Sequence, residues 1–293
     1  MREKVTLQSI TENKDIQIVY SDKDVVIFDT IQQLAEISAA HLELNAVAIC
    51  TKGKIQGLLN GQTLELCGNQ VGIIPSGSLV TNMMVSPDYE IKVLCINNEV
   101  LHDFLREKMR LWDEMMYVRR FHIITMEDKD MAFYMHFYEM LEMCLQSPND
   151  FPFRSDVIQA LLRSGMLALC GALKKQLYDV EVPVLSSNGY FHRFLDILHQ
   201  EMVKHRTVEW YAEQLCISPK YLSVLCKKYS DKTANQWITE NVVEDIRYYL
   251  RQTDLSIKQI SDKLGFSNPS FFGKYVKEHL GVTPMKFREG GDR

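Results

Sequence analysis

The ten residues VEWYAEQLCI at positions 208–217 recur as IKQISDKLGF at positions 257–266, an offset of 49. Apolar side chains occupy the same places in both copies, at the spacing of one face of a helix. Each copy is followed by a pair of residues suited to begin a new helix, Ser218-Pro219 in the first and Asn268-Pro269 in the second. Ser and Asn are favoured helix N-caps, and Pro is favoured at the first helical position. The sequence therefore predicts the same two-helix unit twice, in an all-helical C-terminal region.

The second helix of each unit is predicted at residues 219–228 and 269–278, and residues 235–251 are predicted to form a helix that joins the copies. Gly265 supplies the positive φ that ends the preceding helix. In a helix-turn-helix the second helix enters the major groove of DNA, so two such helices about one DNA turn apart, roughly 34 Å, would read successive grooves. Ordinary helical hairpins have similar apolar spacing. The repetition of capping and turn residues favours the helix-turn-helix interpretation.

A longer motif covers the second copy and the residues after it. The signature S-I-x-x-I-A … G-F … x-S-Y-F … F-K … G-x-T-P … Y-R is matched almost throughout by Ser256-Ile257, Ile260-Ser261, Gly265-Phe266, Ser270-Phe271-Phe272, Val276-Lys277, Gly281-Val282-Thr283-Pro284 and Phe287-Arg288. Residues 190–288 therefore resemble the AraC/XylS family of bacterial transcription regulators. The resemblance implies sequence-specific binding of double-stranded DNA, with RNA polymerase and a small-molecule effector as further partners.

The resemblance also implies which side chains face DNA. In the first recognition helix the base-facing positions are Lys220, Ser223 and Val224, with Lys227 near phosphate. In the second they are Ser270, Gly273 and Lys274. The expected DNA-binding set is Lys220, Ser223, Val224, Lys227, Lys228, Asn268, Ser270, Gly273, Lys274 and Lys277.

Several positions depart from the family pattern. Val224 stands where many relatives have Arg or another polar residue, and Val242 stands where they commonly have Arg. Lys274 stands in a usual Arg position, and Asp231 replaces a common Gly. Val224 offers apolar contact with a thymine methyl, and Gly273 has no side chain with which to read a base. Phosphate contacts are therefore expected to supply much of the affinity.

The N-terminal region has the period of β-strands. Short apolar runs at 25–28, 46–50 and 91–96 are predicted strands, and the segments 55–59 and 62–66 flank Asn60-Gly61, a strong hairpin signal. Several short strands at this spacing predict a small antiparallel barrel or sandwich. This order, strands followed by helices, is similar to the layout of the family, in which a cupin-like sensor domain is followed by helices. The predicted fold class is an α+β multidomain chain, with strands to about residue 97.

Helical periodicity follows over residues 100–178. Residues 125–128 resemble a helix N-terminus, and Met131, Tyr134, Tyr138, Leu141 and Leu145 form one stripe. A third helix is expected from Ser155. The predicted domains are residues 1–180 for sensing or dimerisation, a linker at 181–189 with turn-forming residues, and residues 190–293 for DNA binding.

Composition is consistent with a cytoplasmic regulator. The net charge is −5, but residues 188–293 carry 16 Lys and Arg against 13 Asp and Glu, a balance of +3 that leaves −8 for the preceding residues. Phosphate binding is thus expected only in the C-terminal part. No secretory signal or bilayer-length apolar run is recognised, and no membrane partner is expected. The seven scattered cysteines form no C-x-x-C pair and are interpreted as reduced, core-filling thiols.

The role of the N-terminal domain is left open between sensing a small molecule and serving as a dimerising scaffold. Leu58, Leu64, Ile73 and Leu94 either line the sheet interior or are ordinary core residues, and the helix from Met131 to Leu145 is either a seam of a homodimer or packed within the monomer. A DNA-binding protein with no effector is a further alternative. A cupin-type metalloenzyme is disfavoured because His41-Leu42-Glu43 has no His-x-His partner, so no metal, cofactor or catalytic residue is expected.

Overall fold

The structure is a computed structural model that describes residues 3–31, 38–120, 122–148, 152–175, 187–200 and 205–290. The chain divides into two compact units, Met1–Val180 and Glu181–Arg293. The predicted linker starts in residues outside this description. Its last three residues belong to a helix that begins at Ser187.

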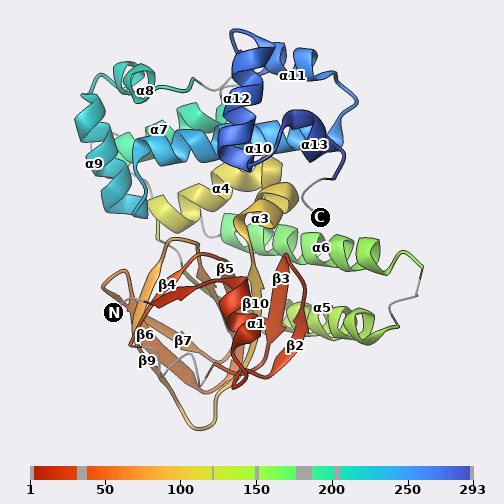
Figure 1. Ribbon diagram of the computed structural model, residues 1–293. Coiled ribbons are helices and arrows are strands. Elements are labelled where there is room, and N and C mark those ends of the chain that lie inside the picture. Colours follow the sequence, from red (N-terminus) through yellow and green to blue (C-terminus); the bar gives the residue numbers. More distant parts are fainter. Residues whose placement is uncertain are drawn as a thin grey trace. The chain divides into compact units, whose positions relative to one another are not determined.

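The N-terminal unit contains two β-sheets that face each other, as the predicted sandwich requires (Figure 1). One sheet has the order β1-β4-β9-β6-β7 and the other β11-β8-β5-β10-β3-β2. The strands are β1 (Glu3–Val5), β2 (Ile18–Ser21), β3 (Val25–Phe28), β4 (Ala39–Leu42), β5 (Asn45–Lys52), β6 (Lys54–Leu59), β7 (Gln62–Cys67), β8 (Gln70–Ile74), β9 (Leu79–Val85), β10 (Glu90–Ile96) and β11 (Ile123–Thr125). The predicted α+β fold class is confirmed.

The hairpin between β6 and β7 forms where the sequence predicts it. Asn60 and Gly61 have φ angles of 51° and 80°, and Leu59 pairs with Gln62 directly across the turn. Positive φ at both central residues gives a turn whose twist matches that of the strands. The β6–β7 pair in turn supplies one wall of the sheet interior.

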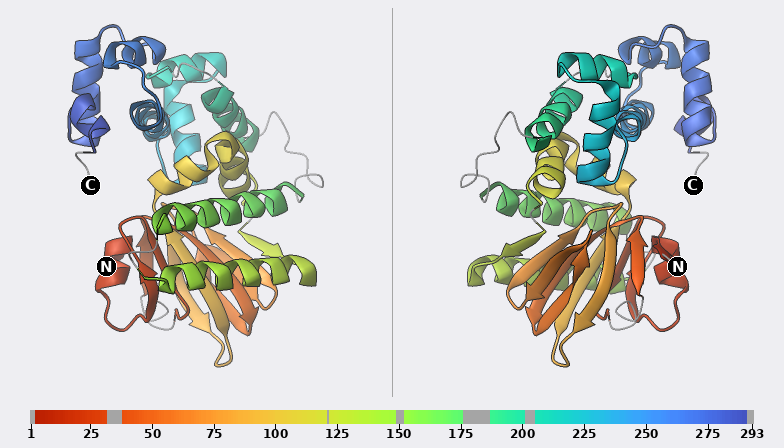
Figure 2. Two further views of the ribbon diagram at one scale, coloured as in Figure 1. Left: turned by 90° about the vertical axis from the view of Figure 1, so that its right-hand side faces the viewer. Right: turned by 90° about the vertical axis from the view of Figure 1, so that its left-hand side faces the viewer.

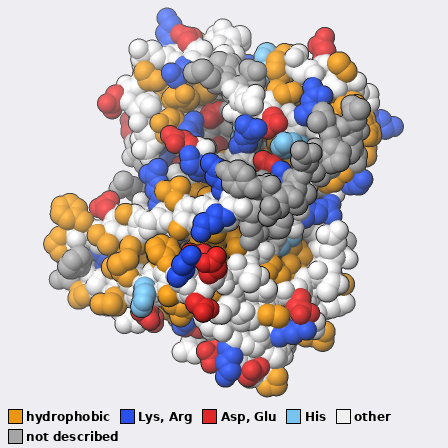
Figure 3. Space-filling model, turned by 180° about the vertical axis from the view of Figure 1, so that it is seen from behind, with side chains coloured by type: hydrophobic (Ala, Val, Ile, Leu, Met, Phe, Trp, Pro, Cys, Tyr) orange, Lys and Arg blue, Asp and Glu red, His pale blue; other side chains and the backbone are white. Residues whose placement is uncertain are grey.

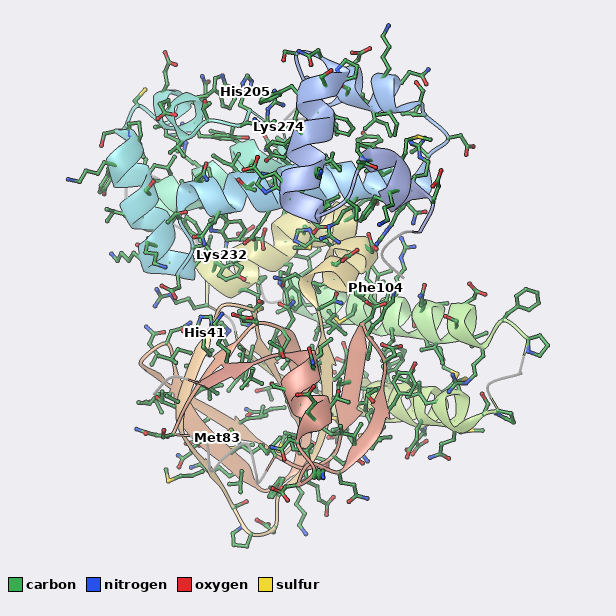
Figure 4. The ribbon with its side chains drawn as sticks, in the orientation of Figure 1. His41, Met83, Phe104, His205, Lys232 and Lys274 are labelled. Carbon is green, nitrogen blue, oxygen red and sulfur yellow. The ribbon has the colours of Figure 1, made fainter. Side chains whose placement is uncertain are left out.

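The interior between the two sheets contains a cavity of about 120 Å³. Leu58 and Leu64 line it as predicted, together with Phe28, Val93 and Met83, which Figure 4 labels on β9. Ile73 and Leu94 do not line the cavity, and Ile73 is a fully buried core residue instead. Their neighbours Gly72, Ile74, Val93 and Cys95 face the cavity, while Leu94 faces the helices on the outer side. Successive residues of a strand point to opposite faces, so an error of one residue reverses the assignment.

Two long helices, α5 (Asp128–Gln146) and α6 (Arg154–Lys175), pack side by side against the outer face of the second sheet (Figure 2). The predicted stripe from Met131 to Leu145 is buried within the unit, so those residues do not form an exposed seam. The helix N-terminus predicted at residues 125–128 is confirmed: Glu127 is the N-cap of α5, although its side chain makes no cap hydrogen bond. The other helical segments of this unit are α1 (Leu7–Glu12), α3 (Asn98–Leu105), a 3-10 turn (Arg106–Lys108), α4 (Met109–Asp113) and a π-helical turn (Glu114–Val118).

Helix α6 is apolar on more than one face. Ile158, Leu162 and Leu169 are buried against the rest of the unit, whereas Val157 and Leu167 are 38% and 40% exposed. By length and composition alone, this helix could cross a membrane, contrary to the expectation that the chain has no such run. Its packing against α5 also fits a core helix of a globular domain.

The C-terminal unit is helical throughout its described residues. Its helices are α7 (Ser187–Gln200), α8 (Val208–Gln214), α9 (Pro219–Ser230), α10 (Ala234–Gln252), α11 (Ile257–Lys263), α12 (Pro269–Leu280) and α13 (Pro284–Arg288). Helix α10 is the predicted joining helix. It buries Trp237, Ile238, Val242, Ile246 and Leu250 and packs against α8 and α9 at one end and α11 to α13 at the other (Figure 1).

The cysteines are all described, and all are free thiols. Cys50, Cys95, Cys170 and Cys226 are buried, and burial raises the pKa of the last three thiols to about 12. Cys67 and Cys144 are partly buried. Cys216 is exposed in the turn between α8 and α9, so the interpretation of core-filling thiols was wrong for this residue.

Candidate nucleic-acid interface

The two recognition helices begin with the same hydrogen-bonded cap. In α9 the Ser218 hydroxyl accepts a hydrogen bond from the Tyr221 backbone N–H at 3.2 Å. In α12 the Asn268 side-chain carbonyl accepts one from the Phe271 N–H at 2.8 Å. Pro219 and Pro269 follow at the first helical position. Both helices extend two residues beyond the predicted ends, to Ser230 and Leu280.

The turns before these helices require left-handed backbone. Gly265 has φ of 66°, as predicted, and the corresponding residue of the first copy, Cys216, has φ of 55°. Leu222 and Phe272 then anchor α9 and α12, each with none of its side chain exposed. Because cap, turn and anchor correspond, the two helices present corresponding faces to solvent.

The exposed face of α9 includes Lys220, Val224, Lys227 and Lys228, with Ser223 partly buried beside them. The Val224 side chain is 54% exposed. The face of α12 includes Asn268, Ser270, Lys274 and Lys277, with Gly273 partly buried among them. Figure 4 labels Lys274 on this helix. The ten predicted residues therefore lie on the solvent-facing sides of these two helices and their caps.

Two of the ten have structural roles as well. The Asn268 side chain caps α12, so its acceptor oxygen is occupied. Lys227 pairs with Asp231: its Nζ lies 3.0 Å from the Asp231 carboxylate and donates to the Asp231 carbonyl at 2.5 Å. A lysine held over the end of its own helix has less freedom to reach phosphate.

Asp231 is the residue that ends α9, and its φ is 55°. The corresponding residue of α12 is Gly281, with φ of 76°. A side chain disfavours this conformation, so Asp231→Gly is expected to raise the free energy of unfolding by about 0.5–1 kcal/mol. The exposed pair with Lys227 offsets little of this gain. Denaturant unfolding of the full chain measures the change.

The matched control is Gly281→Asp, which introduces in α12 the residue that α9 already has. It is expected to destabilise by a similar amount. Equal effects of the two substitutions in the same direction would contradict the assignment of strain to the left-handed position.

The surroundings of Gly273 and Val242 account for two departures from the family pattern. A Cβ added at Gly273 would meet no atom within 4 Å, so the glycine is not required by packing. Its bare backbone allows α12 to approach a surface closely. Val242 is only 3% exposed on α10, so the change from a usual Arg places an apolar residue in the core.

Sequence reasoning missed two exposed aromatic residues. Tyr221 and Phe271 are 41% and 48% exposed at the third position of α9 and α12. Their identical places in the two copies could have identified them, since each directly precedes a buried anchor. A surface that combines lysines, aromatic rings and capped helix N-termini is suited to contact phosphates and base edges.

Of the residues considered for metal binding, Glu43 has a side-chain partner and His41 belongs to a paired strand. The Glu43 carboxylate accepts a hydrogen bond from Lys4 Nζ at 2.6 Å, and His41 lies in β4, where it pairs with Leu79 of β9. Over the described ranges no group of three or more His, Cys, Asp and Glu side chains is placed to hold a metal ion.

Comparison with known proteins finds a family match within the C-terminal unit. Residues 211–290 match a family model described as a helix-turn-helix domain. The Msm operon regulatory protein of Streptococcus mutans is 27% identical over 137 residues, which cover 46% of this chain and 49% of that protein. The regulatory protein PocR of Salmonella typhimurium is 36% identical over 78 residues, 27% of this chain and 26% of that protein. The chain thus spans half or less of the length of these relatives.

Solved structures give weaker likenesses. ToxT from Vibrio cholerae, in its complex with an unsaturated fatty acid, aligns over 92% of this chain and 96% of its own. Its TM-score is 0.36 and its identity 12%, which is below the level at which a common fold follows.

Proposed function

Because the C-terminal unit is a helix-turn-helix domain of the AraC type, we propose that the chain is a transcription regulator that binds specific sites in double-stranded DNA. The observation that carries the proposal is the duplicated cap, turn and anchor, which gives α9 and α12 matching solvent-facing sides. Each helix would enter a major groove with its N-terminal end foremost, and the two would occupy successive grooves.

The chemistry of the two faces suggests how a site is read. Lys274 is exposed, and within the described part of the chain no carboxylate pairs with it. A lysine in this place can donate to guanine O6 and N7 or to phosphate. Val224 and Tyr221 offer apolar contact, which suits thymine methyl groups. Gly273 has no side chain to contact a base, but it allows the backbone of α12 to approach DNA closely.

Lys274→Ala is expected to weaken binding to a duplex selected by the full-length protein by about 5- to 150-fold, the loss that corresponds to one good base contact. Fluorescence anisotropy titration near physiological salt measures it. Lys274→Arg should retain binding, because a guanidinium group can donate two hydrogen bonds to one guanine. Lys286→Ala on α13 removes an equal charge outside the recognition helices and serves as the control.

Two outcomes separate the parts of this proposal. Unchanged affinity of Lys274→Ala would remove Lys274 from the interface but leave the helix assignment intact. If the folded full-length protein bound no duplex from a random library even at low salt, DNA binding itself would be refuted.

We further propose that the N-terminal unit senses a small molecule, and that the ligand is uncharged and apolar. The cavity supports this: of its 22 lining residues, none is charged, and Gln56 and Cys95 alone carry polar groups. Well-packed interiors contain few voids of this size, because an empty one of about 120 Å³ costs roughly 3 kcal/mol. A regulator that needs no effector would gain stability by filling it.

Dimerisation through α5 and α6 completes the proposal. Figure 3 shows hydrophobic side chains gathered over these helices, at the left of the view. Phe133, Met140 and Met143 on α5 are 50%, 48% and 73% exposed, and Val157 and Leu167 add to them from α6. Contiguous apolar surface of this kind marks protein contacts, and most soluble assemblies pair identical surfaces about a two-fold axis. A monomer in sedimentation equilibrium at micromolar concentration would refute this part.

A further inference from the structure

One arginine reaches from the first helix-turn-helix into the turn of the second. Arg206 lies immediately before α8, whose N-cap is Thr207. Its guanidinium donates one hydrogen bond to the Leu264 carbonyl at 3.1 Å and another to the Gly265 carbonyl at 2.8 Å. It also lies over the Phe266 ring, 4.1 Å from the centroid.

These three contacts hold the segment that directs α12. Leu264 ends α11, and Gly265 has the left-handed backbone that turns the chain toward α12. The Phe266 ring packs edge-on against the buried anchor Phe272, with 5.1 Å between ring centroids. Carbonyls at the end of a helix lack donors within the helix, and a cation is favoured beside them. The planar fork of a guanidinium suits two adjacent acceptors and a ring face together.

The geometric consequence comes from the position of α10. That helix packs against elements of both copies, so it joins the two recognition helices along a single axis. A connection along one axis allows twisting about it. Arg206 adds a second point of attachment away from that axis, between the segment before α8 and the turn before α12.

We propose that Arg206 is a positioning residue that fixes the rotation of α12 relative to α9, and so sets the number of base pairs between the two half-sites read by one chain. This inference rests on the proposed DNA-binding function. Successive base pairs of B-form DNA are rotated by roughly 34°, since about 10.5 of them complete a turn. A fixed rotation between the helices therefore selects one spacing.

The experiment uses the full-length protein and the duplex it selects from a random library. Chemical interference mapping locates the two half-sites, and versions with one base pair added or removed between them are then compared. The wild-type protein is expected to lose about tenfold or more in affinity at either altered spacing, comparable to losing one good base contact. Arg206→Leu, which keeps an apolar stem over Phe266, is expected to reduce this discrimination to about threefold or less.

Arg288 provides the matched control. It also donates to two backbone carbonyls, Leu250 at 3.2 Å and Leu255 at 2.6 Å, but both belong to the second half of the domain. Arg288→Leu should lower thermal stability and leave the spacing preference as it is in the wild type. Arg206→Lys keeps the charge with a single point of attachment, and its discrimination should lie between those of Arg206→Leu and the wild type.

Each result is decisive. Unchanged discrimination in a folded Arg206→Leu protein overturns the proposal, and so does a wild-type protein indifferent to spacing. If Arg206→Leu does not fold, wild-type discrimination in Arg206→Lys overturns it instead. Failure of the wild type to bind any duplex refutes DNA binding, a result distinct from these.

Discussion

Phe272→Ala is expected to lower the free energy of unfolding of the C-terminal unit by about 3–5 kcal/mol. Phe272 has none of its side chain exposed, and its ring packs against Phe266 in the turn that precedes α12. Removing the ring leaves a void in a small helical core and frees the helix that the turn directs. Since domains are stable by only about 5–15 kcal/mol, the loss is a large fraction of the total.

The neighbouring residue gives a control with the same chemical change. Phe271 is 48% exposed, so Phe271→Ala should alter stability by less than about 0.5 kcal/mol. Hydrogen exchange of the α12 amides in the full-length protein measures both variants and avoids assuming one transition for two units. Comparable losses of protection in the two variants would mean that α12 is not anchored as described.

An uncharged apolar ligand is expected to raise the thermal midpoint of the N-terminal unit by about 5–10 °C when present at a hundred times its dissociation constant. At that concentration binding contributes about 2.7 kcal/mol, and each kcal/mol moves the midpoint by roughly 2–4 °C in a domain of this size. 1-Octanol is a suitable first probe, because the cavity lining is apolar apart from Gln56 and the Cys95 thiol.

Octanoate provides the chemical control, since a carboxylate buried without a cation is strongly disfavoured. Ala48 lines the cavity from β5, so Ala48→Phe should abolish the response to octanol. Ala132→Phe, at an exposed position of α5, should leave it intact. A larger shift with octanoate than with octanol would contradict an uncharged ligand, and a response retained in Ala48→Phe would place the site elsewhere.

The C-terminal architecture follows from the sequence because its signals are local and duplicated. Ser218 and Asn268 lie three residues before the N–H groups that they cap, and a proline suited to the first helical position follows each, so local chemistry specifies where α9 and α12 begin. Gly265 likewise acts on its own φ. Features of this kind depend only on residues close together in the sequence, and the structure confirms these caps and this turn.

The misassigned residues depend on contacts that sequence periodicity does not encode. Leu94 and Val93 are both apolar because both faces of β10 are covered, one by the opposite sheet and one by α5 and α6. Alternation then no longer distinguishes inside from outside. Arg206 was not recognised for a related reason. Its partners lie 58 and 59 residues away and are backbone carbonyls, which every residue has.

The position of α10 in the chain has a consequence for how the protein is made. Helices α8 and α9 are synthesised before α10, yet α10 supplies the buried face on which they rest. The first recognition helix therefore leaves the ribosome without a complete core and gains one when residues 234–252 have emerged. Truncated chains that end before α10 are expected to be aggregation-prone substrates for chaperones and proteases. The N-terminal unit of such chains is synthesised earlier and is expected to fold without α10.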